Sequence, residues 1–177
     1  INKLNLGISP IYEPGLNELI KKNYIAKRLI FTTDLKKAVN SSDIIFICVG
    51  TPTKKGSLKV DLSYVYKSIK EIISSTKNKK IIVTKSTVPV GTGDEIEKII
   101  KKLKKKNFEI ISNPEFLREG DAIRDFRYPD RIVIGSNNKR ATTKMKSLYD
   151  PLIKKGAKFF STSRRGAEII KYASNAF

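Results

Sequence analysis

Two acidic side chains stand four residues apart in the segment Asn113–Gly120, which reads Asn-Pro-Glu-Phe-Leu-Arg-Glu-Gly. Glu115 and Glu119 could hold or activate a water molecule. The segment lies between two apolar runs, so it is predicted to be a charged loop held between two strands, where a scaffold often places chemistry. The same two carboxylates would also suit the first turn of a helix, where negative charge is favourable. The local pattern alone favours the helix.

A second polar pair, Lys171 and Asn175, has the spacing of residues on one face of a helix. A cation and an amide donor placed in this way could stabilise a negatively charged oxygen formed from an alcohol or a thioester. The alternative is a lysine on a solvated helix and an asparagine near the end of that helix. Spacing alone favours this alternative.

Two turns carry groups that could contact a nucleotide. The turn 50–52, Gly-Thr-Pro, follows an apolar run and offers backbone N–H groups and a hydroxyl to a phosphate or a ribose. Ser86 and Thr87 present two more hydroxyls shortly before Pro89. Each motif alone is equally typical of a turn that ends a strand or caps a helix.

The composition limits the classes of mechanism. The chain has 177 residues, 40% of them hydrophobic, which suits one domain with a core. It has no histidine, which excludes a histidine base, and its single cysteine, Cys48, excludes an internal disulfide and a thiolate cluster. Cys48 lies in the apolar run 44–49, where we expect it to act as a small buried hydrophobic residue.

The formal net charge of +19 raises nucleic acid as a possible partner. The lysines, however, are concentrated on predicted helices and their ends, and no zinc-finger, RNA-recognition or basic-zipper motif is present. We therefore expect an anionic small ligand and no nucleic acid. We also expect no membrane partner and no signal peptide, since no apolar run approaches the ~18 residues of a membrane span. Because Ile1 is not a translation start, we expect part of a longer chain.

Hydrophobic periodicity predicts strands and helices that alternate along the chain. The predicted strands are 29–32, 43–49, 80–84, 108–112, 131–135 and 158–160. The predicted helices are 35–39, 61–75, 93–103, 139–149 and 165–177. Such alternation predicts an α/β fold with a doubly wound parallel sheet and helices on both faces. Ligands bind beyond the carboxyl ends of the strands in such sheets, where three loops would meet: 50–52, 85–92 and 113–120.

Taken together, the motifs resemble the UDP-glucose 6-dehydrogenase family, within the wider NAD-dependent nucleotide-sugar dehydrogenases. The matching segments keep the family's order and spacing over nearly the whole chain: 10–16, 47–52, 85–92, 113–120, 129–135 and 168–177. The resemblance implies NAD as cofactor and UDP-glucose as substrate, oxidised at C6 in two steps through a cysteine thioester. It also implies a cytoplasmic homodimer or higher oligomer. UDP-N-acetylmannosamine, GDP-mannose, a non-catalytic remnant and, more distantly, a nucleic-acid-binding module are the alternatives.

The resemblance also implies roles for particular residues, and it implies no metal. The residues that would line NAD are Val49, Gly50, Thr51, Pro52, Ser86 and Thr87, with Thr87 also near the catalytic water. The residues that would contact the nucleotide sugar are Glu115, Phe116, Leu117, Arg118, Glu119, Lys171 and Asn175. Glu115 would be the base for thioester hydrolysis, and Glu119 would support substrate and water. Lys171 and Asn175 would stabilise the oxyanion.

Parts of the family's pattern are not found in this sequence. The glycine-rich phosphate turn and the acidic ribose anchor would precede Ile1, and the nucleophilic cysteine would follow Phe177. Cys48, in its predicted buried strand, could not replace that cysteine. We therefore expect residues 1–162 to form a Rossmann-like domain that lacks its first βα unit. We expect residues 163–177 to begin a central dimerisation helix, and the isolated chain to be inactive.

Overall fold

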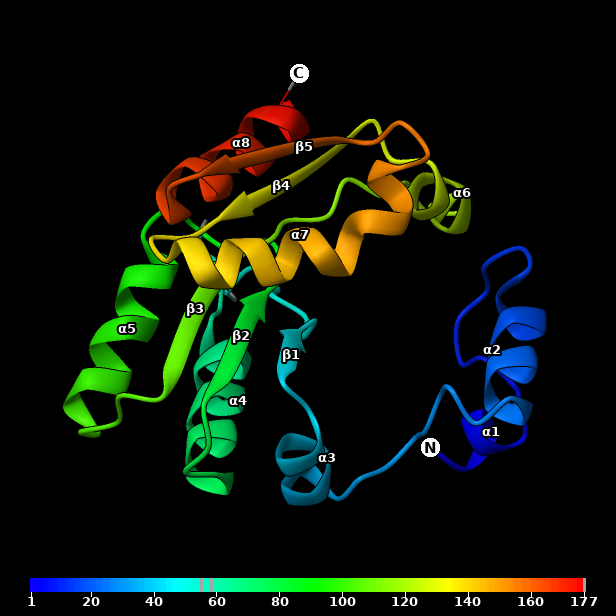
Figure 1. Ribbon diagram of the computed structural model, residues 1–177, viewed down its shortest axis with the longest axis horizontal. Helices are drawn as coiled ribbons and strands as arrows, with labels where there is room; N and C mark the ends of the chain where they lie inside the picture. The colour runs from blue at the N-terminus through cyan, green and yellow to red at the C-terminus, as the bar shows by residue number, and fades with distance from the viewer. Residues whose placement is uncertain (55, 58, 177) are drawn as a thin grey trace.

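The computed structural model describes residues 1–54, 56, 57 and 59–176, and its centre is a five-stranded sheet (Figure 1). In sheet order the strands are β1 (Ile44–Ile47), β2 (Lys80–Thr84), β3 (Phe108–Ser112), β4 (Arg131–Gly135) and β5 (Lys158–Thr162). The helices are α1 (Asn2–Asn5), α2 (Leu16–Ile25), α3 (Leu35–Ser41), α4 (Ser63–Ser75), α5 (Thr92–Lys102), α6 (Ala122–Arg127), α7 (Lys139–Ile153) and α8 (Arg164–Ala176). The predicted α/β class is confirmed. The predicted end of the last helix at Phe177 lies outside the described residues.

The sheet has helices on both faces, as predicted, because its interior strands carry apolar residues on both sides. In β2, Ile82 packs with α4 and α5 on one face, while Ile81 and Val83 pack with α7 on the other. Figure 1 shows α7 crossing in front of the strands with α4 behind them. Continuous β-branched runs of this kind are typical of strands covered on both faces.

The sheet is not wholly parallel, which corrects one part of the prediction. Strands β1, β2 and β3 are parallel, and so are β4 and β5, but β4 runs antiparallel to β3. The two meet only at Ser112 and Gly135, so the rest of β4 continues beyond the end of β3 (Figure 1). The reversal arises because α6 and the loop before it return the chain toward the carboxyl ends of β1, β2 and β3. We call this edge of the sheet the rim.

The predicted strand at residues 29–32 is wrong. These residues form no regular structure between α2 and α3, and Ile30 is 79% exposed. A strand needs a hydrogen-bonding partner, and β1 is the edge strand of the described sheet, with β2 as its neighbour. A β-branched composition cannot produce a strand without that partner.

The predicted burial of Cys48 is also wrong. Strand β1 ends at Ile47, one residue before the cysteine, and Cys48 is exposed. The apolar run alone could not show this, because burial of a residue at the end of an edge strand depends on what covers that edge.

Helix α8 packs closely against β4 at a glycine. A Cβ atom built on Gly135 would lie 2.6 Å from the Ala167 Cβ and 2.8 Å from the Arg164 Cα, so only glycine fits there. This contact brings α8 down onto the sheet directly beside the rim. None of the helices among the described residues has the length and apolarity needed to cross a membrane.

We expect Gly135→Ala to lower the free energy of unfolding by about 1–3 kcal/mol, because the added methyl group overpacks the contact between β4 and α8. Gly50→Ala is the matched control, since a Cβ there has nothing within 4 Å. Urea denaturation of both variants measures the difference. Equal stability of the two variants would contradict the close packing of α8 on β4.

Candidate active site

The two predicted cofactor loops are joined at the rim by side-chain hydrogen bonds. The Ser86 hydroxyl donates to the Val49 carbonyl oxygen over 2.6 Å, and the Thr51 hydroxyl donates to the Thr87 carbonyl oxygen over 2.9 Å. The structure therefore brings these predicted residues together. Their hydroxyl protons are used within the protein, so the two side chains hold the loops in register and are not free donors for a phosphate.

The same loops leave room for a dinucleotide. Gly50 is exposed and has open space where a side chain would be, and Pro52 beside it is also exposed. Bare backbone of this kind allows a ligand to approach closely. The residues present on these loops therefore fit NAD, which would lie against the backbone of the turn at Gly50 and near Thr87.

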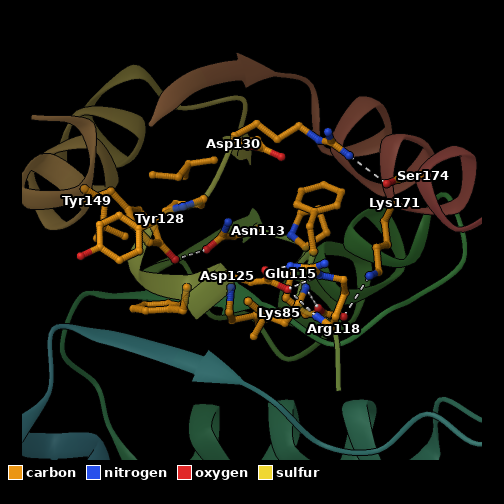
Figure 2. Close-up of a pocket in the computed structure, with 18 of the residues that line it drawn as sticks. Lys85, Asn113, Glu115, Arg118, Asp125, Tyr128, Asp130, Tyr149, Lys171 and Ser174 are labelled. Carbon is orange, nitrogen blue, oxygen red and sulfur yellow. Dashed lines mark hydrogen bonds and ion pairs between the residues drawn. The ribbon is translucent and has the colours of Figure 1, made fainter. Parts of the chain in front are cut away.

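A pocket of about 730 Å³ lies beside these loops, where five parts of the chain converge (Figure 2). Lys85 contributes from the loop after β2. The other walls come from the loop 113–118, α6 with the start of β4, α7 and α8. The pocket exists because β4 extends past the end of β3 and α8 returns to the rim, which leaves a recess between them.

Lys171 and Glu115 form an ion pair inside this pocket. The Lys171 Nζ lies 3.0 Å from the Glu115 Oε1, and the Leu117 N–H donates to the other carboxylate oxygen over 2.7 Å (Figure 2). Lys171 is only 7% exposed, so the interpretation of a solvated helix lysine is wrong. The helix predicted by the local pattern at Glu115 and Glu119 is wrong as well, since residues 113–118 have no regular structure.

These contacts set the charge of the Glu115 carboxylate. Burial by itself would raise its pKa, but the Leu117 N–H and Lys171 outweigh burial and hold the pKa below its ordinary value. Burial also lowers the pKa of Lys85, with Lys171 adding to the effect against Cys48 and Glu115, which oppose it. At neutral pH Glu115 is therefore an ionised carboxylate, able to accept a proton.

The Phe116 ring lies between two cations. The Arg131 guanidinium carbon is 4.5 Å from the ring centre and the Lys171 Nζ is 5.5 Å from it. Arg131 also donates to the Ser174 hydroxyl over 2.8 Å. Cation–π contacts with a ring fix the orientation of the charged groups as well as the ring. Phe116 thus links the loop to β4 and α8.

Arg118 makes ion pairs with two carboxylates of its own neighbourhood. Its guanidinium donates to both carboxylate oxygens of Asp125, over 3.0 and 2.6 Å, and to Asp121 over 2.9 Å. The hydrogen bond and charge of Arg118 lower the pKa of Asp125 to about 2. A bidentate pair of this kind holds the loop geometry. Arg118 therefore shapes the pocket wall.

A buried hydrogen-bond chain supports the inner side of the pocket. The Tyr149 hydroxyl donates to the Asn113 Oδ1 over 2.6 Å, and the Asn113 amide donates to the Val133 carbonyl over 3.0 Å. Burial raises the pKa of Tyr149 to about 12, so it stays protonated and donates. Asn113 is 2% exposed and joins α7, β4 and the loop that carries Glu115.

Helix α8 is anchored one turn before Lys171. Glu168 is buried and accepts from the Gly91 N–H over 2.6 Å and the Gly93 N–H over 2.8 Å, at the start of α5. Burial raises the pKa of Glu168 against the effect of these two hydrogen bonds. Arg164, also buried, donates to Asp94 and Glu97 of α5. These contacts fix α8 relative to the loop that carries Thr87.

The predicted site residues fall into two groups in the structure. Those that line the pocket are Glu115, Phe116, Leu117, Arg118, Lys171 and Asn175, and those on the neighbouring cofactor loops are Val49, Gly50, Thr51, Pro52, Ser86 and Thr87. Glu119 is exposed and does not line the pocket. Its role in supporting substrate and water, like the other individual roles, stays a prediction.

Sequence reasoning missed several supporting residues. Asn113 was named only as the first residue of the segment 113–120, although a polar residue directly after a buried strand signals a rim position. Glu168 and Arg164 were not assigned roles, and neither was Tyr149. No spacing in the sequence relates these residues to their partners, which lie 20 to 77 positions away.

Comparisons with known proteins identify the family of this chain. The family model for the UDP-glucose/GDP-mannose dehydrogenase family, NAD binding domain, matches residues 1–153. UDP-glucose 6-dehydrogenase of Rhizobium meliloti (strain 1021) is 50% identical over 100% of this chain and 41% of that protein. The Bacillus subtilis (strain 168) enzyme TuaD is 46% identical over 100% of this chain and 38% of its own length.

Two solved structures share the fold. A GDP-mannose dehydrogenase from Pseudomonas aeruginosa has a TM-score of 0.92 and 38% identity, covering 99% of this chain and 41% of that one. A UDP-glucose dehydrogenase from Pyrobaculum islandicum has a TM-score of 0.91 and 37% identity, covering 100% of this chain and 41% of that one. The chain belongs to the UDP-glucose/GDP-mannose dehydrogenase family, within its NAD-binding domain. NAD, the predicted cofactor, is the cofactor of this family, and the chain spans about 40% of the relatives it matches.

We expect Glu115→Gln to lower the free energy of unfolding by roughly 1–2 kcal/mol near neutral pH, because Lys171 loses its charged partner. The folded-state pKa of Glu115 is below its ordinary value, so this stabilisation is present above about pH 4.3, where the unfolded carboxyl is ionised. It is lost as the pH falls through the folded-state pKa. Urea denaturation at pH values from 7 down to 3 measures the difference from the unsubstituted chain.

Glu119→Gln is the matched control, since Glu119 is in the same loop and is exposed. Its difference from the unsubstituted chain should be small. The same pH-dependent loss in both variants would show that the Glu115–Lys171 pair does not stabilise the fold.

Proposed function

We propose that this chain provides the NAD-binding domain of a dehydrogenase that oxidises UDP-glucose at C6 to UDP-glucuronate. The observation that carries the proposal is the ion pair between the buried Lys171 and the partly buried Glu115, 3.0 Å long, in a pocket next to the cofactor loops. The relatives from Rhizobium meliloti and Bacillus subtilis, which match the whole chain, are UDP-glucose 6-dehydrogenases. This supports UDP-glucose as the substrate.

The pocket residues suit the proton transfers of such an oxidation. Removing a hydride and a proton from the C6 alcohol gives an aldehyde, and adding water with loss of a second hydride and two protons gives the carboxylate. NAD, when bound, accepts the hydrides, one on each of two molecules. Lys171 and Asn175 lie four residues apart on α8 and both line the pocket, so they can donate hydrogen bonds to the oxygen on which negative charge develops.

Glu115 provides the carboxylate that accepts a proton from water. Its lowered pKa keeps it ionised at neutral pH, and Lys171 holds it in one orientation. When Lys171 turns to a substrate oxygen, Glu115 loses its cation, which raises its affinity for a proton at that point. The ion pair therefore couples stabilisation of the oxyanion to activation of the water.

Other features are proposed on the resemblance alone. The thioester intermediate requires a nucleophilic cysteine, and Cys48, the one cysteine of this chain, does not line the pocket. We propose that residues 163–177 begin the central helical domain and that the whole enzyme is a cytoplasmic homo-oligomer. Phe116 and Leu117 would contact the nucleotide sugar, while Arg118 would act through the loop geometry.

GDP-mannose is the second candidate substrate. The Pseudomonas aeruginosa GDP-mannose dehydrogenase has a TM-score of 0.92 with this chain, as close as that of the UDP-glucose dehydrogenase structure. The residues that line the pocket do not distinguish UDP-glucose from GDP-mannose. The absorbance of NADH measures turnover by the whole enzyme with UDP-glucose, GDP-mannose or UDP-N-acetylmannosamine. The comparison distinguishes the candidate substrates. Turnover of GDP-mannose but not UDP-glucose would overturn the proposed substrate.

We expect Lys171→Met in the whole enzyme to lower kcat by about 100- to 1000-fold, because a preorganised donor to the developing oxyanion is lost. Lys70→Met, at an exposed position on α4, is the control and should leave kcat unchanged. Steady-state formation of NADH with saturating UDP-glucose measures both. A Lys171→Met enzyme with normal kcat would remove Lys171 from the mechanism.

A further inference from the structure

The segment Pro10–Leu16 contributes no residue to the lining of the pocket, yet it holds a carboxylate against the pocket wall. Glu13 begins a tight turn in which the Leu16 N–H donates to the Glu13 carbonyl over 3.1 Å. Pro14 and Gly15 take the central positions, and Gly15 has φ 78° and ψ 0°, as a type II turn requires. The turn therefore fixes the direction in which the Glu13 side chain extends.

Glu13 accepts two backbone hydrogen bonds at the start of α6. The Gly120 N–H donates to the Glu13 Oε2 over 3.1 Å, and the Ala122 N–H donates to the Oε1 over 2.8 Å. In the sequence these partners are 107 and 109 residues away. Figure 1 shows α1 and α2 set apart from the sheet, so this contact joins the N-terminal segment to the pocket wall.

The first N–H groups of α6 need a hydrogen-bond acceptor from another segment, because the side chain of the helix's own N-cap residue does not accept from them. The Asp121 side chain makes no capping hydrogen bond to α6 and instead accepts from Arg118 over 2.9 Å. The first N–H groups of a helix have no partner within the helix, and a carboxylate beside them is favourable. Glu13 supplies that carboxylate from the N-terminal segment.

Asp125 connects α6 to the loop 113–118. Arg118 donates to Asp125 with its backbone N–H over 2.8 Å as well as with its guanidinium. The position of the loop therefore depends on the position of α6, and the position of α6 depends on its contact with Glu13. Phe116 and Leu117 lie immediately before Arg118 and share its constraint.

We propose that Glu13 is a positioning residue for nucleotide-sugar binding. It holds α6 so that the Arg118–Asp125 pair keeps the loop 113–118 in the shape that receives the substrate. This inference rests on the proposed function, and it adds to that function a residue that does not line the pocket. The cofactor loops at Val49 and Thr87 have no contact with Glu13 among the described hydrogen bonds, so NAD binding is independent of it.

Steady-state kinetics of the whole enzyme test this proposal. Glu13→Ala should raise KM for the nucleotide sugar about tenfold, which corresponds to about 1.4 kcal/mol. The KM for NAD should change less than about twofold, because Glu13 donates to or accepts from neither cofactor loop among the described hydrogen bonds, whereas a purely structural loosening would raise both KM values. Glu18→Ala is the matched control, because Glu18 is exposed on α2, shortly after the turn that begins at Glu13. It should leave every parameter unchanged.

Hydrogen–deuterium exchange supplies a second measurement that needs no substrate. The peptide containing Gly120 and Ala122 should exchange faster in Glu13→Ala, while the peptide containing β2 should not. Glu13→Gln keeps the shape and one carbonyl oxygen, so it should give an intermediate effect. If Glu13→Ala does not fold, Glu13→Gln decides the question.

Unchanged exchange together with an unchanged KM for the nucleotide sugar would overturn the proposal. Equal rises in both KM values, or the same effects in Glu18→Ala, would overturn it too. An unsubstituted enzyme without turnover of any nucleotide sugar would instead defeat the proposed function. The exchange of Gly120 and Ala122 would then decide the role of Glu13 by itself.

Discussion

The close contact between Gly135 and helix α8 is the constraint on which the pocket depends. Because a Cβ on Gly135 would lie 2.6 Å from Ala167, the helix can approach β4 only at a glycine. Glu168 and Arg164 then tie the same helix to α5. With α8 held in this way, Lys171 lies one turn further along and reaches the loop after β3. Without that approach, its ammonium group would lie in solvent.

The pocket contains charged groups whose burial would be unfavourable if each lacked a partner of opposite charge. Lys171 is 7% exposed, and a buried ammonium group is stable as a cation only with a partner. Glu115 provides that partner, and the Leu117 N–H satisfies its second oxygen. Removing one member of such a pair leaves the other charge buried without compensation. The same pairing that stabilises the fold therefore keeps Glu115 ionised, as the proposed chemistry needs.

The loop 113–118 is irregular in backbone, but its geometry is strongly determined by side chains. Asn113 anchors its start through Tyr149 and the Val133 carbonyl, and Arg118 anchors its end through Asp125. Between these anchors, Glu115 and Phe116 face Lys171. A loop held at both ends by buried or bidentate hydrogen bonds can present a carboxylate in one position, which is what catalysis by positioning requires.

The sequence by itself determined the class of the fold, the family and six of the residues that line the pocket: Glu115, Phe116, Leu117, Arg118, Lys171 and Asn175. Apolar β-branched runs alternating with helical periodicity specified the strands and helices, and the order of short motifs specified the family. These features are local, because each depends on residues that are near in the chain. The same local patterns wrongly placed a strand at 29–32 and buried Cys48, since both outcomes depend on a neighbour across the sheet.

Only the tertiary structure decided which polar residues act together. The reversal of β4, the burial of Lys171 and the caps supplied by Glu168 and Glu13 all join residues from distant parts of the chain. No spacing in the sequence relates Glu13 to Gly120, or Glu168 to Gly91. Their pairing follows from free backbone N–H groups at the helix starts, which need an acceptor that the folded chain brings to them.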